Sequence, residues 1–136
     1  MALTTTISRK ELERIAALAY EGETLKVMLC SVGSTGFAAE STVAQWQTVE
    51  QSGNGYARFT ATISSGAYNS ANGRYEIPAI DATFTASGGG VGFTYDRIVI
   101  YINGATYPHS IIVEDPNIAL APGQTQTYRI ILIADD

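Results

Sequence analysis

The chain has 136 residues, of which 46% are hydrophobic and 15% are charged, and its formal net charge is −5. That length suits one domain, so we expect residues 1–136 to fold as a single domain. Its eight lysines and arginines form no cluster of cations, which argues against a nucleic-acid partner. Its longest apolar run, residues 15–20, is far shorter than the roughly 20 residues of a membrane span, which argues against a membrane partner.

The first predicted element is a helix from about Arg9 to Tyr20. Ser8 and Glu11 have the spacing of a capping box, in which each residue satisfies a free amide of the first turn. Apolar residues then recur at spacings of three and four, which places them on one helix face: Leu12, Ile15, Ala16 and Ala19. Gly22 is the expected end of this element, because glycine adopts a positive φ easily.

Several charges of this helix oppose its dipole. Arg9 and Lys10 lie at the positive end, and Glu21 and Glu23 at the negative end. These charges leave two interpretations open. The helix packs on the chain's own sheet as an imperfect surface helix, or a neighbouring subunit neutralises its charges.

After the helix the hydrophobic period changes from 3.6 to 2, which is typical of strands. Three apolar residues share one face of a strand that ends at Ser31, and a loop over residues 31–36 follows. A short helical turn is predicted over residues 42–47, with Ser41 as its N-cap. Residues 57–63 and 80–86 alternate between apolar and polar side chains, which indicates strands with one dry face.

Two further runs, residues 98–102 and 130–133, are apolar on both strand faces and therefore need cover on both sides. Asn-Gly pairs, which favour hairpin turns, occur at residues 54, 72 and 103. Their spacing suits long antiparallel strands. We therefore expect an all-β fold, an antiparallel β-sandwich or jelly roll over residues 23–136, with an N-terminal arm and helix over residues 1–22.

The chain contains few groups for catalysis. Its one cysteine, Cys30, cannot form an internal disulfide and follows apolar residues, where a thiol serves as packing. Its one histidine, His109, is accompanied by no Gly-x-Ser-x-Gly motif. Adjacent carboxylates such as Glu114 and Asp115 point to opposite faces of a strand, so they make no paired-acid site. We expect no enzyme, no cofactor and no metal site.

Aromatic residues lie beside several predicted turns. Tyr56, Tyr68, Tyr75 and Tyr107 either cap the ends of the core or form a surface for a protein or a glycan. The core interpretation is the simpler one. If the chain has an interface, we expect these residues to contribute to it: Ile7, Leu12, Ile15, Trp46, Tyr68 and Tyr107.

Three segments resemble a known family. They are GNGYAR at residues 53–58, SGGGVGFTYDRIVIY at residues 87–101 and LAPGQTQTYRIIL at residues 120–132. Their order is similar to that in small virion proteins of tailed bacteriophages, including phages of marine cyanobacteria. Those proteins are β-rich components of the head or tail, such as head decoration proteins and head fibres.

The resemblance implies a structural role in a virion. The expected function is a capsid decoration or cement protein that stabilises the head, forms a homotrimer or another cyclic oligomer, and binds the major capsid protein or another virion protein. It would be assembled in the cytoplasm of the host bacterium and then reside in the virion. The alternative is a tail- or fibre-associated module that binds a glycan receptor through Trp46 and the turn tyrosines.

Overall fold

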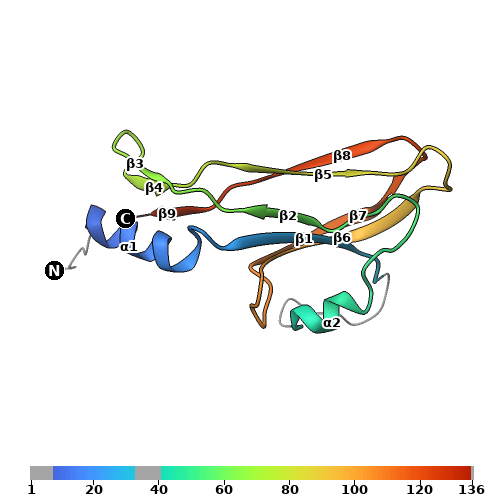
Figure 1. Ribbon diagram of the computed structural model, residues 1–136, viewed down its shortest axis with the longest axis horizontal. Coiled ribbons are helices and arrows are strands. Elements are labelled where there is room, and N and C mark those ends of the chain that lie inside the picture. Colours follow the sequence, from blue (N-terminus) through green and yellow to red (C-terminus); the bar gives the residue numbers. More distant parts are fainter. Residues whose placement is uncertain (1–7, 33–40, 136) are drawn as a thin grey trace. The chain divides into compact units, whose positions relative to one another are not determined.

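The computed structural model describes residues 8–32 and 41–135 (Figure 1). Strands predominate over helices in this part of the chain, and the pairings β1–β6, β3–β4, β4–β9 and β6–β7 are antiparallel. The prediction of an all-β fold with antiparallel sheets is therefore confirmed.

The described residues group into two compact units. Unit 1 combines residues from the ranges 1–23, 62–80 and 129–136, and unit 2 combines residues from the ranges 24–61 and 81–128. The single domain expected from the length stays a prediction.

Unit 1 contains helix α1 (Arg9–Ala19) and a sheet of three strands in the order β3-β4-β9. The strands of this sheet are short: β3 (Ala67–Asn69), β4 (Arg74–Glu76) and β9 (Ile133–Asp135). Helix α1 contacts all three strands. This arrangement supports the interpretation of a helix that packs on the chain's own sheet.

The start of α1 follows the predicted cap in part. The backbone N–H of Glu11 donates to Ser8 Oγ at 3.2 Å, which satisfies one free amide of the first turn. The Glu11 carboxylate pairs with the guanidinium of Arg14 one turn later. The helix expected from about Arg9 to Tyr20 is confirmed to within one residue.

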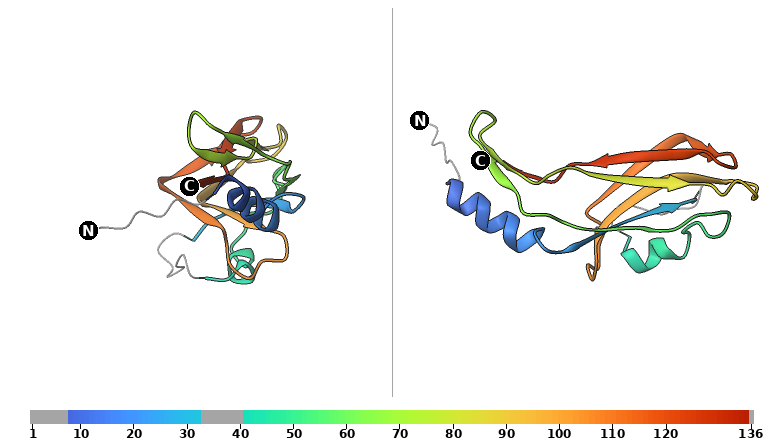
Figure 2. Two further views of the ribbon diagram at one scale, coloured as in Figure 1. Left: turned by 90° about the vertical axis from the view of Figure 1, so that its left-hand side faces the viewer. Right: turned by 45° about the horizontal axis from the view of Figure 1, so that its top comes forward.

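Unit 2 contains two sheets and a short helix, α2 (Val43–Gln47). The larger sheet has the order β2-β1-β6-β7, and the smaller sheet pairs β5 with β8. The strands have these bounds: β1 (Thr24–Cys30), β2 (Phe59–Thr62), β5 (Ile80–Thr85), β6 (Phe93–Ile102), β7 (Ser110–Leu120) and β8 (Thr125–Ile130). Figures 1 and 2 show α2 and the β5–β8 pair on opposite sides of the larger sheet.

The two central strands, β1 and β6, are covered on both faces. They pair in register from Leu25 opposite Ile102 to Cys30 opposite Arg97. Each residue from Ile98 to Tyr101 is at most 4% exposed. The predicted cover on both sides of the run 98–102 is therefore confirmed for residues 98–101, whereas Ile102 is half-buried.

Helix α2 covers one face of this central pair. Its start is fixed by Thr42, whose side chain accepts from the Gln45 N–H while the Gln45 side chain accepts from the Thr42 N–H. The helix was predicted here, but with Ser41 as the N-cap, which is wrong by one residue. The apolar residues beneath it form one cluster: Met28, Cys30, Val32, Val43, Trp46, Val99 and Tyr101.

Five aromatic rings, here called the aromatic cluster, link β6 to the smaller sheet. They are Tyr56, Phe84, Phe93, Tyr95 and Tyr128, and the centroids of neighbouring rings are 5.8–6.4 Å apart. The hydroxyls of Tyr95 and Tyr128 are 2.7 Å apart, so one donates to the other. This pair satisfies both hydroxyls within an apolar environment.

A register shift in β6 lets this strand contribute side chains both to the apolar cluster beneath α2 and to the aromatic cluster. In a regular strand, Tyr95 and Val99 would share a face, because residues an even number apart point the same way. The pairing with β7 shifts between Tyr95 and Arg97. Val99 therefore belongs to the apolar cluster beneath α2, while Tyr95 contacts Tyr128. Asp96 at the shift is buried, and its carboxylate accepts from the Val32 N–H at 3.0 Å.

The run 130–133 was predicted to be one strand covered on both faces, and the structure differs from this prediction. Strand β8 ends at Ile130 and β9 begins at Ile133. Ile130 and Leu132 are buried, whereas Ile131 is 58% exposed. The prediction is wrong because the run joins two strands of different sheets and keeps one apolar side chain in solvent.

The Asn-Gly pairs all lie at turns, though in different ways. At Asn54-Gly55 both residues have positive φ, and the Tyr56 N–H donates to the Gly53 carbonyl at 3.0 Å, as in the hairpin-type turn expected from the dipeptide. The pair at residue 72 lies in the loop of the β3–β4 hairpin. At residue 103 the connection between β6 and β7 is longer than the predicted two-residue turn and spans residues 103–109.

Gly92 is the backbone position that tolerates a side chain least. Its φ is +80°, and a Cβ there would lie 2.1 Å from the Leu120 carbonyl oxygen, which belongs to the strand paired with β6. We expect Gly92→Ala to lower the free energy of unfolding by more than about 1 kcal/mol in urea titrations. Gly89→Ala is the matched control, because a Cβ at Gly89 meets nothing within 4 Å; equal losses in both variants would contradict this account.

Trp46 joins α2 to the central strands. It is 1% exposed, so we expect Trp46→Ala to lower the free energy of unfolding by about 3–5 kcal/mol through lost contacts and a cavity. Gln47→Ala changes an exposed residue of the same helix and should shift the urea midpoint little. A Trp46→Ala variant as stable as Gln47→Ala would show that α2 does not hold the core.

Candidate interaction surfaces

The residues predicted as an interface have very different exposures. In unit 1, Ile15 on α1 is 36% exposed and Leu12 lies on the same helix, with a side chain that the structure does not describe. Ile7 lies outside the described residues. In unit 2, Tyr107 is 59% exposed in the connection between β6 and β7.

Trp46 belongs to the core of unit 2 rather than to its surface. Its ring lies in the cluster beneath α2, and the backbone carbonyl of this residue accepts from the Cys30 thiol at 3.5 Å. The apolar spacing of Val43 and Trp46 indicates burial of this helix face, and the structure confirms that burial. Trp46 is therefore corrected from an interface residue to a core residue.

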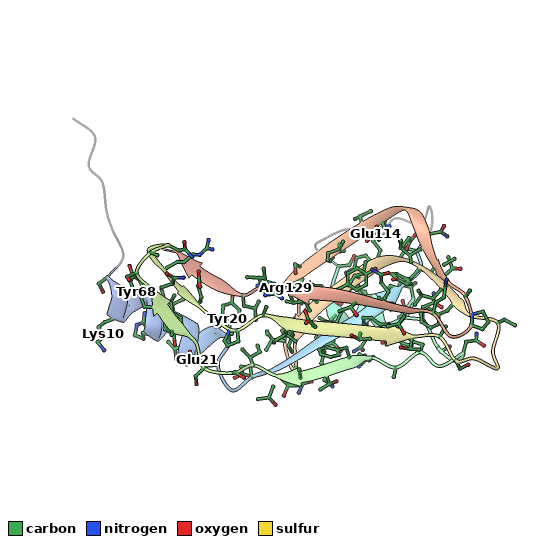
Figure 3. All side chains as sticks on the ribbon, turned by 90° about the horizontal axis from the view of Figure 1, so that it is seen from above. Lys10, Tyr20, Glu21, Tyr68, Glu114 and Arg129 are labelled. Carbon is green, nitrogen blue, oxygen red and sulfur yellow. The ribbon has the colours of Figure 1, made fainter. Side chains whose placement is uncertain are left out.

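Most of the turn tyrosines contribute to packing. Tyr56 lies in the aromatic cluster, and Tyr75 is 6% exposed with its hydroxyl donating to the Glu21 carboxylate. Tyr68 is the cross-strand neighbour of Tyr75, so the two share a sheet face. Tyr68 (Figure 3) is half-buried, and it is among the residues that line the groove described below.

The opposite face of the unit 1 sheet carries a polar network around Glu76. The Glu76 carboxylate accepts from Arg74 Nε at 2.9 Å, from Asn72 Nδ2 at 3.0 Å and from Asn69 Nδ2 at 3.1 Å. These hydrogen bonds, above all the one from Arg74, lower the pKa of Glu76 to about 2. The carboxylate therefore stays ionised at any ordinary pH.

A groove of about 760 Å³ lies along this network. Besides the residues around Glu76, its lining includes Arg129 and the exposed Ile131. Arg129 (Figure 3) is exposed, and no carboxylate of the described residues pairs with it. Sequence reasoning missed this groove because its lining comes from two distant segments, residues 65–79 and 129–131. It missed Ile131 because that residue lies in an apolar run expected to be buried.

A second network, around Glu50, holds the turn that precedes β2. The Glu50 carboxylate binds Arg58 through two nitrogens and accepts from the Tyr56 hydroxyl at 2.5 Å. That hydroxyl also accepts from the Leu29 N–H at 3.2 Å. Burial and the Glu50 carboxylate raise the pKa of Tyr56, so its phenol keeps the proton that it donates. No sequence pattern indicated this set of contacts.

The residues considered for catalysis lie apart from any pocket lining described above. Burial raises the pKa of the Cys30 thiol to about 12, which agrees with its predicted role as packing. His109 is exposed, and its Nδ1 lies 3.2 Å from Ser110 Oγ. Among the residues that the structure describes, no three histidine, cysteine or acidic side chains gather as a metal site would require.

Strand β7 forms one edge of the larger sheet within the described residues. Two apolar side chains near its start are exposed, Ile112 by 38% and Val113 by 59%. Farther along, residues 114–117 of β7 lie opposite the single residue Asp96, because the pairing passes from Val113 to Ile118. An irregularity of this kind blocks pairing of that part of the edge with another strand. It leaves residues 110–113 and 118–120 as regular parts, of which the first carries the two exposed apolar side chains.

Comparisons with protein-family models, with curated proteins and with solved structures find no match to this chain.

Neither helix in the described ranges combines the length and the apolar character that crossing a membrane requires.

The depressed pKa of Glu76 gives a prediction for acid stability. Its carboxylate favours the folded state at pH values above the usual pKa of 4.5, and this contribution is lost as the pH falls toward 2. In an NMR titration of the side-chain carboxyls we expect a Glu76 midpoint of about 2, and a clear rise toward 4.5 in Arg74→Gln.

Arg129→Gln removes the other arginine of the groove and should leave that midpoint in place, because Arg129 makes no hydrogen bond to Glu76. A wild-type midpoint near 4.5, or an Arg74→Gln midpoint equal to that of the wild type, would contradict the network.

Proposed function

We propose that this chain is a non-enzymatic structural protein of a tailed-phage virion, which decorates the head and stabilises the shell. The observation that supports the proposal most directly is how the three family-like segments meet. Tyr56 comes from the first segment, Phe93 and Tyr95 from the second, and Tyr128 from the third, and all four are in the aromatic cluster. The segments that resemble phage virion proteins thus share one core rather than three unrelated sites.

The finer fold in this proposal is a β-sandwich. Its layers are the sheet β2-β1-β6-β7 and the sheet β5-β8, and the aromatic cluster fills the space between them. The alternating burial of β5 supports this, since Ala82 and Phe84 are buried while Thr83 and Thr85 are exposed. Thr83 and Thr85 instead form hydroxyl pairs across to β8 on the outer face.

The edge of β7 is the surface proposed for assembly with the major capsid protein. Residues 110–113 offer unpaired backbone groups and two exposed apolar side chains, so a strand of the capsid protein would gain hydrogen bonds and bury apolar area together. A trimer would present three such edges at once. Weak contacts then add through effective concentration, which suits a protein that binds a repeating shell.

The alternative, a tail- or fibre-associated module that binds glycans, has less support. Exposed aromatic rings are the usual platforms for sugars, but Trp46, Tyr56 and Tyr75 lie in packed regions. Tyr107 is the exposed tyrosine among those proposed for this role. Loss of envelope-polysaccharide binding in a Tyr107→Ala variant would favour this alternative.

The β7 edge can be tested with empty heads of the phage whose genome encodes the chain. We expect Val113→Lys to weaken co-sedimentation with these heads by at least about tenfold, because docking would bury an unpaired charge. Val91→Lys is the matched control, since Val91 is 85% exposed in a loop outside the strand edge. Unchanged binding by Val113→Lys, with the fold intact by circular dichroism, would eliminate β7 as the docking edge.

A further inference from the structure

A second pocket, which the proposed assembly edge does not use, lies in unit 2 beside α2. Its volume is about 520 Å³, and its walls come from β1, from the start of α2 and from the turn after β6. The Val43 N–H donates to the Thr106 carbonyl at 2.8 Å, which holds the helix against this turn (Figure 1). The pocket is therefore built from segments that are fixed to one another.

The buried hydroxyl of Tyr101 lies among the residues that line this pocket. Tyr101 is 3% exposed, and its hydroxyl makes no hydrogen bond with any of the residues that the structure describes. Burying a hydroxyl without a partner destabilises a protein, so such groups are rare. A ligand oxygen atom that enters the pocket and reaches this hydroxyl would supply the missing partner.

Two cations line the same pocket, although the chain as a whole is acidic. Lys26 is the cross-strand neighbour of Tyr101, so the lysine side chain and the phenol share a face of the sheet. No carboxylate of the described residues pairs with Lys26. Arg58 is already bound to Glu50, which leaves Lys26 as the uncompensated charge, while the guanidinium keeps further N–H groups that can donate.

We propose that this pocket binds the carboxylate of an acidic peptide segment. Lys26 provides the charge, the Tyr101 hydroxyl donates to a carboxylate oxygen, and the free N–H groups of Arg58 orient the group. Binding involves no covalent step. It is independent of the virion role, because any protein with an accessible Asp or Glu side chain offers this chemistry.

The charge and the walls of the pocket favour this ligand over two others. One uncompensated lysine matches a monoanion such as a carboxylate better than it matches a phosphate, which carries up to two charges. A uronic sugar would offer a carboxylate as well, but the aromatic residue of the lining, Tyr101, is buried and provides no ring face for stacking. Small apolar residues, Val43, Ala44 and Ala105, instead leave room for a peptide side chain.

The test uses the full chain and the peptide acetyl-Gly-Glu-Gly-amide, with its Gln counterpart as the neutral probe. We expect the Glu peptide to shift the backbone amide signals of residues 103–106 in NMR titrations, and the Gln peptide to leave them in place. Lys26→Gln should weaken binding of the Glu peptide by at least about tenfold. Lys10→Gln, which changes the chain's other lysine in the same way, should bind like the wild type.

Tyr101→Phe tests the hydroxyl without changing the ring. We expect weaker binding and an unfolding midpoint no lower than that of the wild type, because the hydroxyl has no hydrogen-bond partner among the described residues. Equal binding by Tyr101→Phe or Lys26→Gln would overturn the site. Tighter binding of sodium glucuronate or of inorganic phosphate than of the Glu peptide would overturn the choice of ligand.

Discussion

The pairing of β1 with β6 is the constraint on which unit 2 depends. Both strands are apolar on both faces over most of their paired length, so neither can lie at a surface. One face of this strand pair is covered by the short helix α2, whose Trp46 side chain buries a large apolar area. On the N-terminal side of the register shift in β6, the aromatic cluster packs the β5–β8 pair against this strand. The turns and polar networks of unit 2 hold these layers in place.

Local patterns in the sequence predicted local structure well. The helix at residues 9–19 and the alternation of β5 followed directly from spacing, because each pattern is decided by neighbours within a few residues. The break at residues 130–133 could not be predicted in this way. Its four apolar residues satisfy a strand pattern, but the chain passes there from the sheet of β8 to the sheet of β9, and only tertiary structure sets that point.

The family-like segments and the candidate surfaces overlap in part, because Arg58 and Tyr101 line the pocket beside α2 and Arg129 and Ile131 line the groove of unit 1. The segments supply Tyr56, Phe93, Tyr95 and Tyr128 of the aromatic cluster, whereas Phe84 lies outside them. Packing restricts residue choice most at such core positions. The exposed side chains of β7 and the charged side chain of Lys26 lie outside the three segments. The resemblance therefore rests mostly on core positions, and any attachment chemistry has to be found among the exposed side chains of this chain.

Glu50 connects the core of unit 2 to the chemistry of its pocket. Through the Tyr56 hydroxyl it holds a ring of the aromatic cluster, and through Arg58 it sets how much positive charge the pocket retains. Replacing Glu50 would release the Arg58 charge and also leave the Tyr56 hydroxyl without its acceptor. The two effects would then be inseparable in one variant. Lys26 has neither link, because it makes no ion pair within the described residues, and so its charge can be removed while the core stays as it is.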